Sequence, residues 1–119
     1  MKDISSRADI ELLINTFYDK LLIIDEMKSP FEGLDFKNHI PNIVSFWSFV
    51  LLDEEGYKTN VFDKHTHLPI KLHMFEIWLN TFNNTVDSLF KGEKAEMAKQ
   101  RATTLTFTFK SKWEKMKPE

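Results

Sequence analysis

The chain has 119 residues, of which 13% are aromatic, 29% are charged, three are glycine and four are proline. This composition excludes an intrinsically disordered chain, a collagen-like repeat and a flexible linker. The length suits one domain with a proper core, so we predict a single domain over residues 1–119. The eleven phenylalanines, three tryptophans and two tyrosines are many for so short a chain and need an explanation.

Charge and cysteine content narrow the classes of function. The formal net charge is −2, the pI is about 6.1 and the only arginines are Arg7 and Arg101, so no basic surface for a nucleic acid is indicated. The absence of cysteine excludes disulfides, thiolate metal sites and iron–sulfur clusters. Neither a signal peptide nor an apolar run of about 20 residues is visible. We expect a soluble, cytoplasmic protein that binds neither nucleic acid nor membrane.

The first predicted element is an amphipathic helix over Arg7–Ile24, in which apolar residues recur at steps of three and four. Ser6 is a good N-cap, and Asp9 stands in the first turn, where the helix dipole favours an acid. Residues 25–28 are polar. Ser29-Pro30-Phe31 is then expected to break the helix and to place a phenylalanine in a short connection.

A second helix is predicted to run to about Leu52. Pro41 fits this helix if Asn38 is the N-cap, because the N–H of the third helical residue has no helical partner anyway. This start places His39 in the first turn, leaning toward the apolar side that Ile43 continues.

After an acidic turn and a loop over residues 53–61, the segment Phe62–Pro69 is expected to form one or two helical turns before its proline. A third helix is predicted over Lys71–Lys91. Gly92 is expected to be a left-handed cap after it.

The fourth predicted helix covers Glu93–Lys115. Its middle, Thr103–Phe109, alternates like a strand, but strong helix formers flank it on both sides. With four long helices, one short histidine-bearing segment and no repeat, the sequence predicts an all-α domain.

Four histidines are the first candidates for chemistry: His39, His65, His67 and His73, of which three lie within nine positions. They can be polar side chains of the surface or of loops. They can hold a transition metal, although no acid stands in a spacing such as His-Glu-x-x-His. A third interpretation makes one histidine of the short segment closed by Leu68-Pro69 the axial ligand of a haem, which also needs a flat apolar slot lined with rings.

The aromatic side chains bear on this third interpretation. Seven of them lie on or near the segments that would surround such a slot: Phe31, Phe46, Trp47, Phe62, Phe75, Trp78 and Phe82. Rings at helical spacing also simply fill a core. Periodicity alone does not separate the two.

A family resemblance covers nearly the whole chain, from about Ile10 to Trp113. Its residues are, in order, Phe17-Tyr18, Phe31, His39, Ile43, Phe46-Trp47, Lys64-His65-Thr66-His67-Leu68-Pro69 and Phe75-Glu76-Ile77-Trp78-Leu79. Together they resemble a bacterial truncated haemoglobin of the third group, whose pattern includes His-x-x-Leu-Pro and Phe-Glu-Ile-Trp-Leu stretches. The resemblance implies a globin-like two-over-two helical sandwich around haem b.

The resemblance also implies roles for single residues. His65 matches the proximal iron ligand, while His67 matches no ligand position. Tyr18, Trp78 and His39 match distal residues. The other implied haem contacts are Phe31, Ile43, Phe46, Trp47, Phe62 and Leu68.

Two features depart from the family pattern. Pro41 lies within the distal helix, which bears on the pose of His39, and the link between Pro69 and Phe75 is short. The partners of the haem propionates stay open, with Lys58, Lys64 and Lys71 as candidates by charge and location.

The function implied by the resemblance is binding of O2, NO, CO or peroxide at a histidine-ligated haem iron. NO-dioxygenase or peroxidase-like activity is compatible with it and would need an external electron donor. Two other functions stay open. One is a haem-free globin-like sensor or interaction module, and the other is a zinc-dependent enzyme using His65, His67 and His73.

Overall fold

The structure is a computed structural model that describes residues 1–31, 36–53 and 72–116. Every element in these ranges is a helix, which confirms the predicted all-α class. The helices are α1 (Arg7–Leu21), α2 (Asp25–Phe31), α3 (Phe36–Leu52), α5 (Leu72–Leu89) and α6 (Glu93–Met116). The predicted short helix over Phe62–Pro69 lies outside the described residues.

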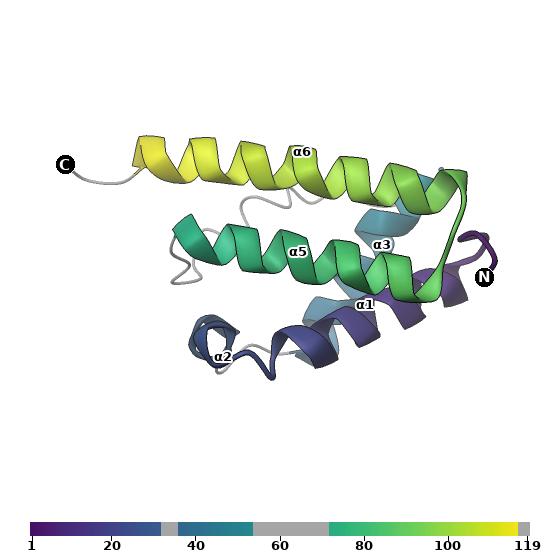
Figure 1. The fold of residues 1–119 in the computed structure, drawn as a ribbon, viewed down its shortest axis with the longest axis horizontal. Coiled ribbons are helices and arrows are strands. Elements are labelled where there is room, and N and C mark those ends of the chain that lie inside the picture. The colour runs from purple at the N-terminus through teal and green to yellow at the C-terminus, as the bar shows by residue number, and fades with distance from the viewer. Residues whose placement is uncertain (32–35, 54–71, 117–119) are drawn as a thin grey trace.

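Two pairs of helices form two layers. α5 and α6 run side by side in opposite directions, and α1 and α3 pack on each other as the second pair (Figure 1). α1 also packs on α5, and α3 touches α6, so the two pairs close around one buried apolar cluster. This arrangement is the expected two-over-two sandwich. None of the described helices is both long enough and apolar enough to span a membrane.

α1 confirms the predicted start and ends earlier than predicted. The Ser6 side chain accepts a hydrogen bond from the backbone N–H of Asp9, as an N-cap does. The buried stripe consists of Ile10, Leu13, Ile14, Phe17, Tyr18 and Leu21. The helix stops at Leu21 rather than Ile24, because the chain turns there to begin α2.

The expected break at Ser29-Pro30-Phe31 was wrong, since α2 continues through all three residues. Asp25 and Glu26 occupy its first turn, where the helix dipole stabilises their charge. Met27 is 1% exposed and anchors this helix in the core. Residues 25–28 contain one apolar residue among charged ones and so form no apolar stripe, which is why periodicity could not indicate a helix here.

The predicted start of the next helix was also wrong. α3 begins at Phe36, so Asn38 is a helical residue and not the N-cap, and Pro41 is the sixth residue, inside the helix. Because proline has no N–H, it cannot donate to the carbonyl of Lys37, which makes it unfavourable at this position. Packing of the Phe36 ring against Tyr18 and against His39 offsets this cost and extends the helix backwards.

α5 and α6 lie within two residues of their predicted limits. Gly92 has a positive φ, as predicted, with a value of 143°. It does not end the preceding helix, however, but stands at the start of α6, where its carbonyl accepts the N–H of Glu96. The carboxylate of Asp3 accepts the N–H groups of Lys94 at 2.8 Å and Ala95 at 2.9 Å. The N-terminal segment therefore caps α6 from the other end of the sequence.

The strand-like alternation in α6 is accommodated by the helix. The hydroxyls of Thr103, Thr104, Thr106 and Thr108 each donate to the carbonyl four residues earlier, at 2.8–3.2 Å. This bond satisfies the threonine without leaving the helix.

Candidate functional site

A small cavity lies where the two layers meet, and each of the four long helices contributes to its wall. Its lining side chains are Ile14, Phe17, Tyr18, Ile43, Phe46, Trp47, Trp78, Phe82, Leu105 and Phe109. The enclosed space is about 20 Å³, enough for one molecule the size of water. No charged side chain is among the lining residues, so the wall is apolar and aromatic.

Tyr18 brings the one hydroxyl of this wall. Its oxygen lies 2.7 Å from Nε2 of His39, and both residues are buried, at 4% and 8% exposure. The histidine tautomer decides which of the two donates. Burial raises the pKa of Tyr18 far above its ordinary value of 10.0, so the side chain remains a neutral hydroxyl.

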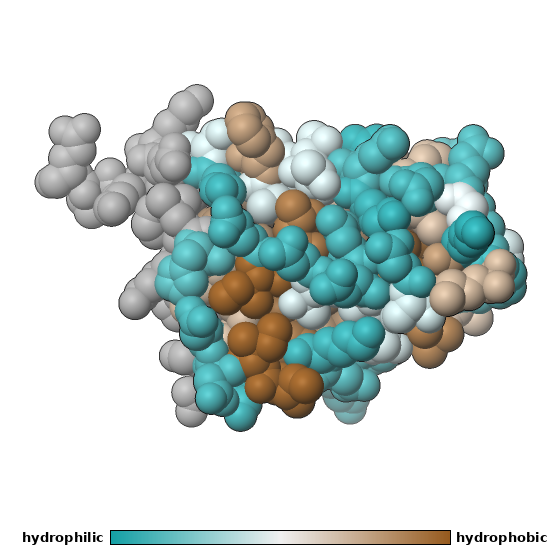
Figure 2. Space-filling view, in the orientation of Figure 1, coloured by the Kyte–Doolittle hydropathy of each residue, from teal (hydrophilic) through white to brown (hydrophobic). Residues whose placement is uncertain are grey.

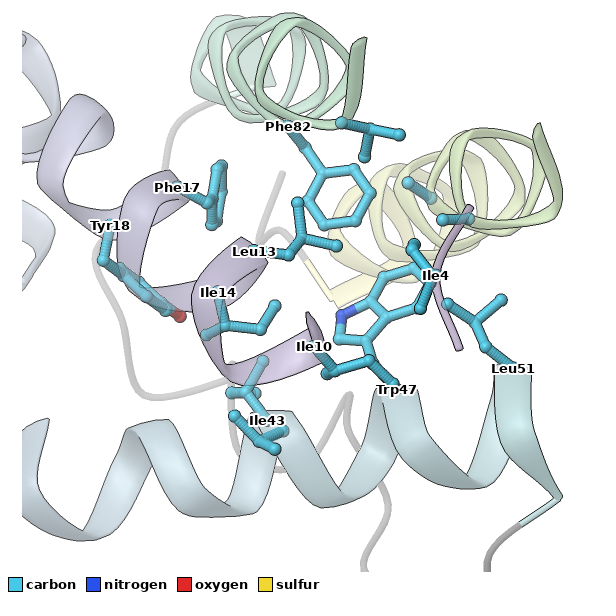
Figure 3. Packing of buried hydrophobic residues seen from close by; sticks show 14 of the residues in the cluster. Ile4, Ile10, Leu13, Ile14, Phe17, Tyr18, Ile43, Trp47, Leu51 and Phe82 are labelled. Atoms are coloured by element: carbon cyan, nitrogen blue, oxygen red, sulfur yellow. The ribbon is translucent and has the colours of Figure 1, made fainter. Parts of the chain in front are cut away.

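A stack of rings forms another part of the wall. Phe82 stacks on Trp47, with ring centroids 4.9 Å apart, and on Trp78 at 5.6 Å. Phe17 meets the edges of Phe82 and Trp78. Figure 3 shows Phe17 from α1, Trp47 from α3 and Phe82 from α5 converging in the core. Offset and edge-on ring pairs are the stable arrangements, so this wall is a preformed surface.

The structure brings together five of the predicted site residues. Tyr18, Ile43, Phe46, Trp47 and Trp78 line the same cavity. His39 adjoins it through its hydrogen bond to Tyr18.

The side chains of the remaining predicted site residues lie outside the part of the chain that the structure describes. Phe31 is the last residue of α2, and its side chain is outside the described part of the chain. His65, Phe62 and Leu68 lie outside the described residues, as do the lysines named for the propionates.

Several lining residues were not singled out as contacts from the sequence. They are Ile14, Phe17, Leu105 and Phe109, whereas Phe82 was expected among the rings around the slot and does line the cavity. Ile14 and Phe17 belong to the apolar stripe of α1, which was a usable signal. Leu105 and Phe109 come from α6, which carries no family motif, so only the packing reveals them.

Phe36 is a further residue that the sequence did not single out. Its ring lies edge-on to Tyr18, with centroids 5.6 Å apart, and to His39 at 6.3 Å. The signal available was its position three residues before His39 on the same helix face. Phe75, by contrast, is buried but absent from the cavity wall.

His73 is engaged outside the cavity. Its Nε2 lies 2.6 Å from Oε2 of Glu26, an exposed pair that links α5 to α2. Within residues 1–31, 36–53 and 72–116, no three metal-ligating side chains form a group that could hold an ion. The other two histidines of the zinc hypothesis, His65 and His67, fall outside these ranges.

Comparisons with known proteins agree with the motif pattern. No family model matches the chain. A curated relative, group 3 truncated haemoglobin ctb of Campylobacter jejuni, is 26% identical over 113 residues, which cover 89% of each chain. The crystal structure of a group III truncated haemoglobin from Campylobacter jejuni matches 100% of both chains with a TM-score of 0.86 and 27% identity. The resemblance found in the motifs is thus confirmed in sequence and in fold.

Proposed function

We propose that this chain, which matches the structure of a group III truncated haemoglobin over its full length, is a haem protein that binds small diatomic ligands. The observation that carries the proposal is the apolar, ring-lined cavity whose one hydroxyl, that of Tyr18, is buried beside His39.

The residue types of the chain suit haem b, while the cavity itself, at about 20 Å³, matches a small ligand and not the porphyrin. A haem needs an apolar slot, rings that pack on the porphyrin and an imidazole for the iron. The cavity wall is aromatic and uncharged, and His65 is the imidazole that we assign to the iron. Phe31, Phe62 and Leu68 are proposed as additional contacts. When bound, the group would supply an iron with one coordination position open to O2, NO, CO or peroxide.

The chain's own groups would hold the outer end of such a ligand. Tyr18 carries a hydroxyl and Trp78 an indole N–H, and both line the cavity. Burial keeps the proton on Tyr18, and the hydroxyl can donate that proton to a ligand when Nε2 of His39 does not accept it. Ile43 and Phe82 make the cavity wall apolar, and in such surroundings each hydrogen bond is electrostatically stronger than in water.

Donors in a dry pocket suit retention or activation of oxygen better than its rapid delivery. Oxidation of NO and peroxidase-like reduction of peroxide are therefore the activities that we propose to test. Either would draw electrons from a separate donor. We place the protein in the cytoplasm, where reductants are available and a cysteine-free chain is at no disadvantage.

Absorption spectra of the full chain in the ferric, ferrous and CO-bound forms test the proposal. We expect a strong Soret band that shifts on adding CO and is lost in His65→Ala. His67→Ala is the matched control, since it removes a neighbouring imidazole that the family pattern does not use, and it should keep the band.

Two results would contradict the haem proposal. A colourless protein that does not take up added haemin would favour the haem-free module. Stoichiometric zinc without a Soret band would favour the zinc enzyme.

A further inference from the structure

The ring of Phe36 packs against both residues of the hydrogen-bonded pair, Tyr18 and His39. Tyr18 and Phe36 are 5.6 Å apart at 70°, Tyr18 and His39 are 5.6 Å apart at 74°, and Phe36 and His39 are 6.3 Å apart at 80°. Each ring thus meets the other two edge-on. The imidazole of His39 has an aromatic neighbour on its own helix and another on α1.

We infer that Phe36 is a positioning residue for ligand binding, which holds the His39 imidazole against the Tyr18 hydroxyl and so controls where that hydroxyl can donate. This inference rests on the proposed function. It concerns a residue that is not among those lining the cavity.

Helix geometry explains why Phe36 can act on His39. The two residues stand three apart in α3, so their side chains are neighbours on one face. Phe36 is partly buried and packs against the core, whereas Lys37 and Asn38 are exposed. A histidine in the second turn of a helix has other rotamers available to it. Contact with Phe36 favours the one that reaches Tyr18, because edge-on ring pairs add stability beyond the area that they bury.

The position of the His39 imidazole matters because it decides whether the Tyr18 proton is free for a ligand. The Tyr18 hydroxyl has one proton to donate. If Nε2 of His39 carries a proton, it donates to the Tyr18 oxygen and leaves the phenolic proton for a ligand. If Nε2 is bare, Tyr18 donates to His39 instead. Loss of the ring pair between Phe36 and His39 lets the imidazole leave the Tyr18 hydroxyl. Phe36→Leu should therefore shift the rate of ligand dissociation in the same direction as His39→Ala.

A double-mutant cycle tests the inference. Oxygen dissociation is measured by stopped flow on the ferrous protein for the wild type, Phe36→Leu, His39→Ala and the double variant. We expect Phe36→Leu alone to change the rate about two- to ten-fold, the range that a lost ring pair allows. In the His39→Ala background the same substitution should have no further effect.

Matched variants separate positioning from general packing. Phe49→Leu removes a ring from the same helix that is 48% exposed, and it should leave the rate unchanged. Phe36→Tyr keeps the ring and should keep the wild-type rate. If Phe36→Leu does not accumulate as folded protein, Phe36→Met replaces it in the cycle.

NMR gives a readout that does not depend on a rate. In the diamagnetic CO-bound form, the ¹⁵N shifts of the His39 imidazole report the hydrogen bond to Tyr18. We expect those shifts to move toward the values of a solvent-exposed imidazole in Phe36→Leu and to stay in Phe49→Leu.

Three results would overturn the inference while leaving the proposed function intact. They are an unchanged dissociation rate in Phe36→Leu, an effect that persists in the His39→Ala background, and His39 shifts that do not respond. Failure of the proposed function is recognised separately, because the wild-type protein would then show no Soret band.

Discussion

Tyr18 is the residue on which the chemistry of the cavity depends. It is 4% exposed, it lies 2.7 Å from His39 and burial raises its pKa, so its proton stays on the phenolic oxygen. An aromatic residue with a hydroxyl brings a donor into an otherwise apolar wall at little cost in polarity.

The first prediction concerns this hydroxyl. Tyr18→Phe should raise the oxygen dissociation rate about ten-fold, since one hydrogen bond in a dry site is worth about 1–2 kcal/mol. Laser photolysis or stopped flow measures the rate. Tyr57→Phe removes the chain's other phenol, which the proposed site does not use, and serves as control. An unchanged rate in Tyr18→Phe would exclude Tyr18 from the ligand contacts.

The second prediction concerns Phe82, which is fully buried and stacks on two tryptophans. Phe82→Ala should lower the free energy of unfolding by about 3–5 kcal/mol, because it leaves a large void among the rings. Phe107→Ala is the matched control on α6, since Phe107 is 72% exposed and should change stability by less than about 0.5 kcal/mol. Equal losses in urea unfolding of the two variants would contradict the ring stack.

At the scale of elements, the start of α6 depends on a residue from the far end of the sequence. The Asp3 carboxylate caps two of its N–H groups, and the carbonyl of Lys2 accepts the N–H of Lys91. A Cβ on Gly92 would stand 2.6 Å from Cγ of Asp3, on a backbone whose φ is 143°. Glycine is therefore required both for conformation and for space.

The third prediction follows from this cap. Asp3→Ala should destabilise the protein by about 0.5–2 kcal/mol, the usual worth of an N-cap. Gly92→Ala should cost more than about 1 kcal/mol, because both its φ and the closeness of Asp3 oppose a side chain. Thermal unfolding measures both, with the exposed Gln100→Ala on the same helix as control. A Gly92→Ala protein as stable as the wild type would contradict this account of the turn.

The element boundaries show where local signals are sufficient. Ser6 and the stripe of α1 locate that helix correctly at its start, because a cap and a period are properties of neighbouring residues. The predicted beginning of α3 was wrong. Ring packing of Phe36 on Tyr18, 18 positions earlier, outweighs the local preference for Pro41 to stand in the first turn of a helix. The α2 helix was missed because its first turn, residues 25–28, holds Met27 as its one apolar residue and so shows no period.

At the scale of the whole molecule, the N-terminal segment and the ring stack both connect the two layers of helices. Ile4 is 2% exposed, Asp3 reaches α6, and Lys2 pairs with Asp9 of α1 at 2.7 Å. Figure 2 shows that hydrophilic side chains cover most of one face, with a hydrophobic patch that runs from α5 to the turn between α1 and α2.

The fourth prediction concerns acid stability. The hydrogen bond from the Lys2 ammonium, helped by the backbone N–H and hydroxyl of Ser5, lowers the pKa of Asp9 from 3.8 to about 2 despite its burial. Burial raises the pKa of Asp3, but the N–H groups of Lys94, Ala95 and Ile4 together lower it further than burial raises it. Both carboxylates therefore stabilise the fold above about pH 4, and this contribution is lost as the pH falls toward 2.

Urea unfolding at pH 5, 3 and 2 measures this loss. Asp9→Asn should be less stable than the wild type at pH 5, and the difference should shrink as the pH falls. Asp19→Asn, exposed on the same helix, is the control. Parallel pH profiles for the wild type and Asp9→Asn would contradict the assignment.

The sequence by itself determined the helical class, the spacing of the apolar stripes and the order of motifs, because each is a relation between residues a few positions apart. Only the tertiary structure decided that Tyr18 meets His39 across 21 positions, that Phe36 joins them, and that Leu105 and Phe109 reach the same cavity. These contacts depend on how helices cross and on the direction of each side chain, and no local period encodes either.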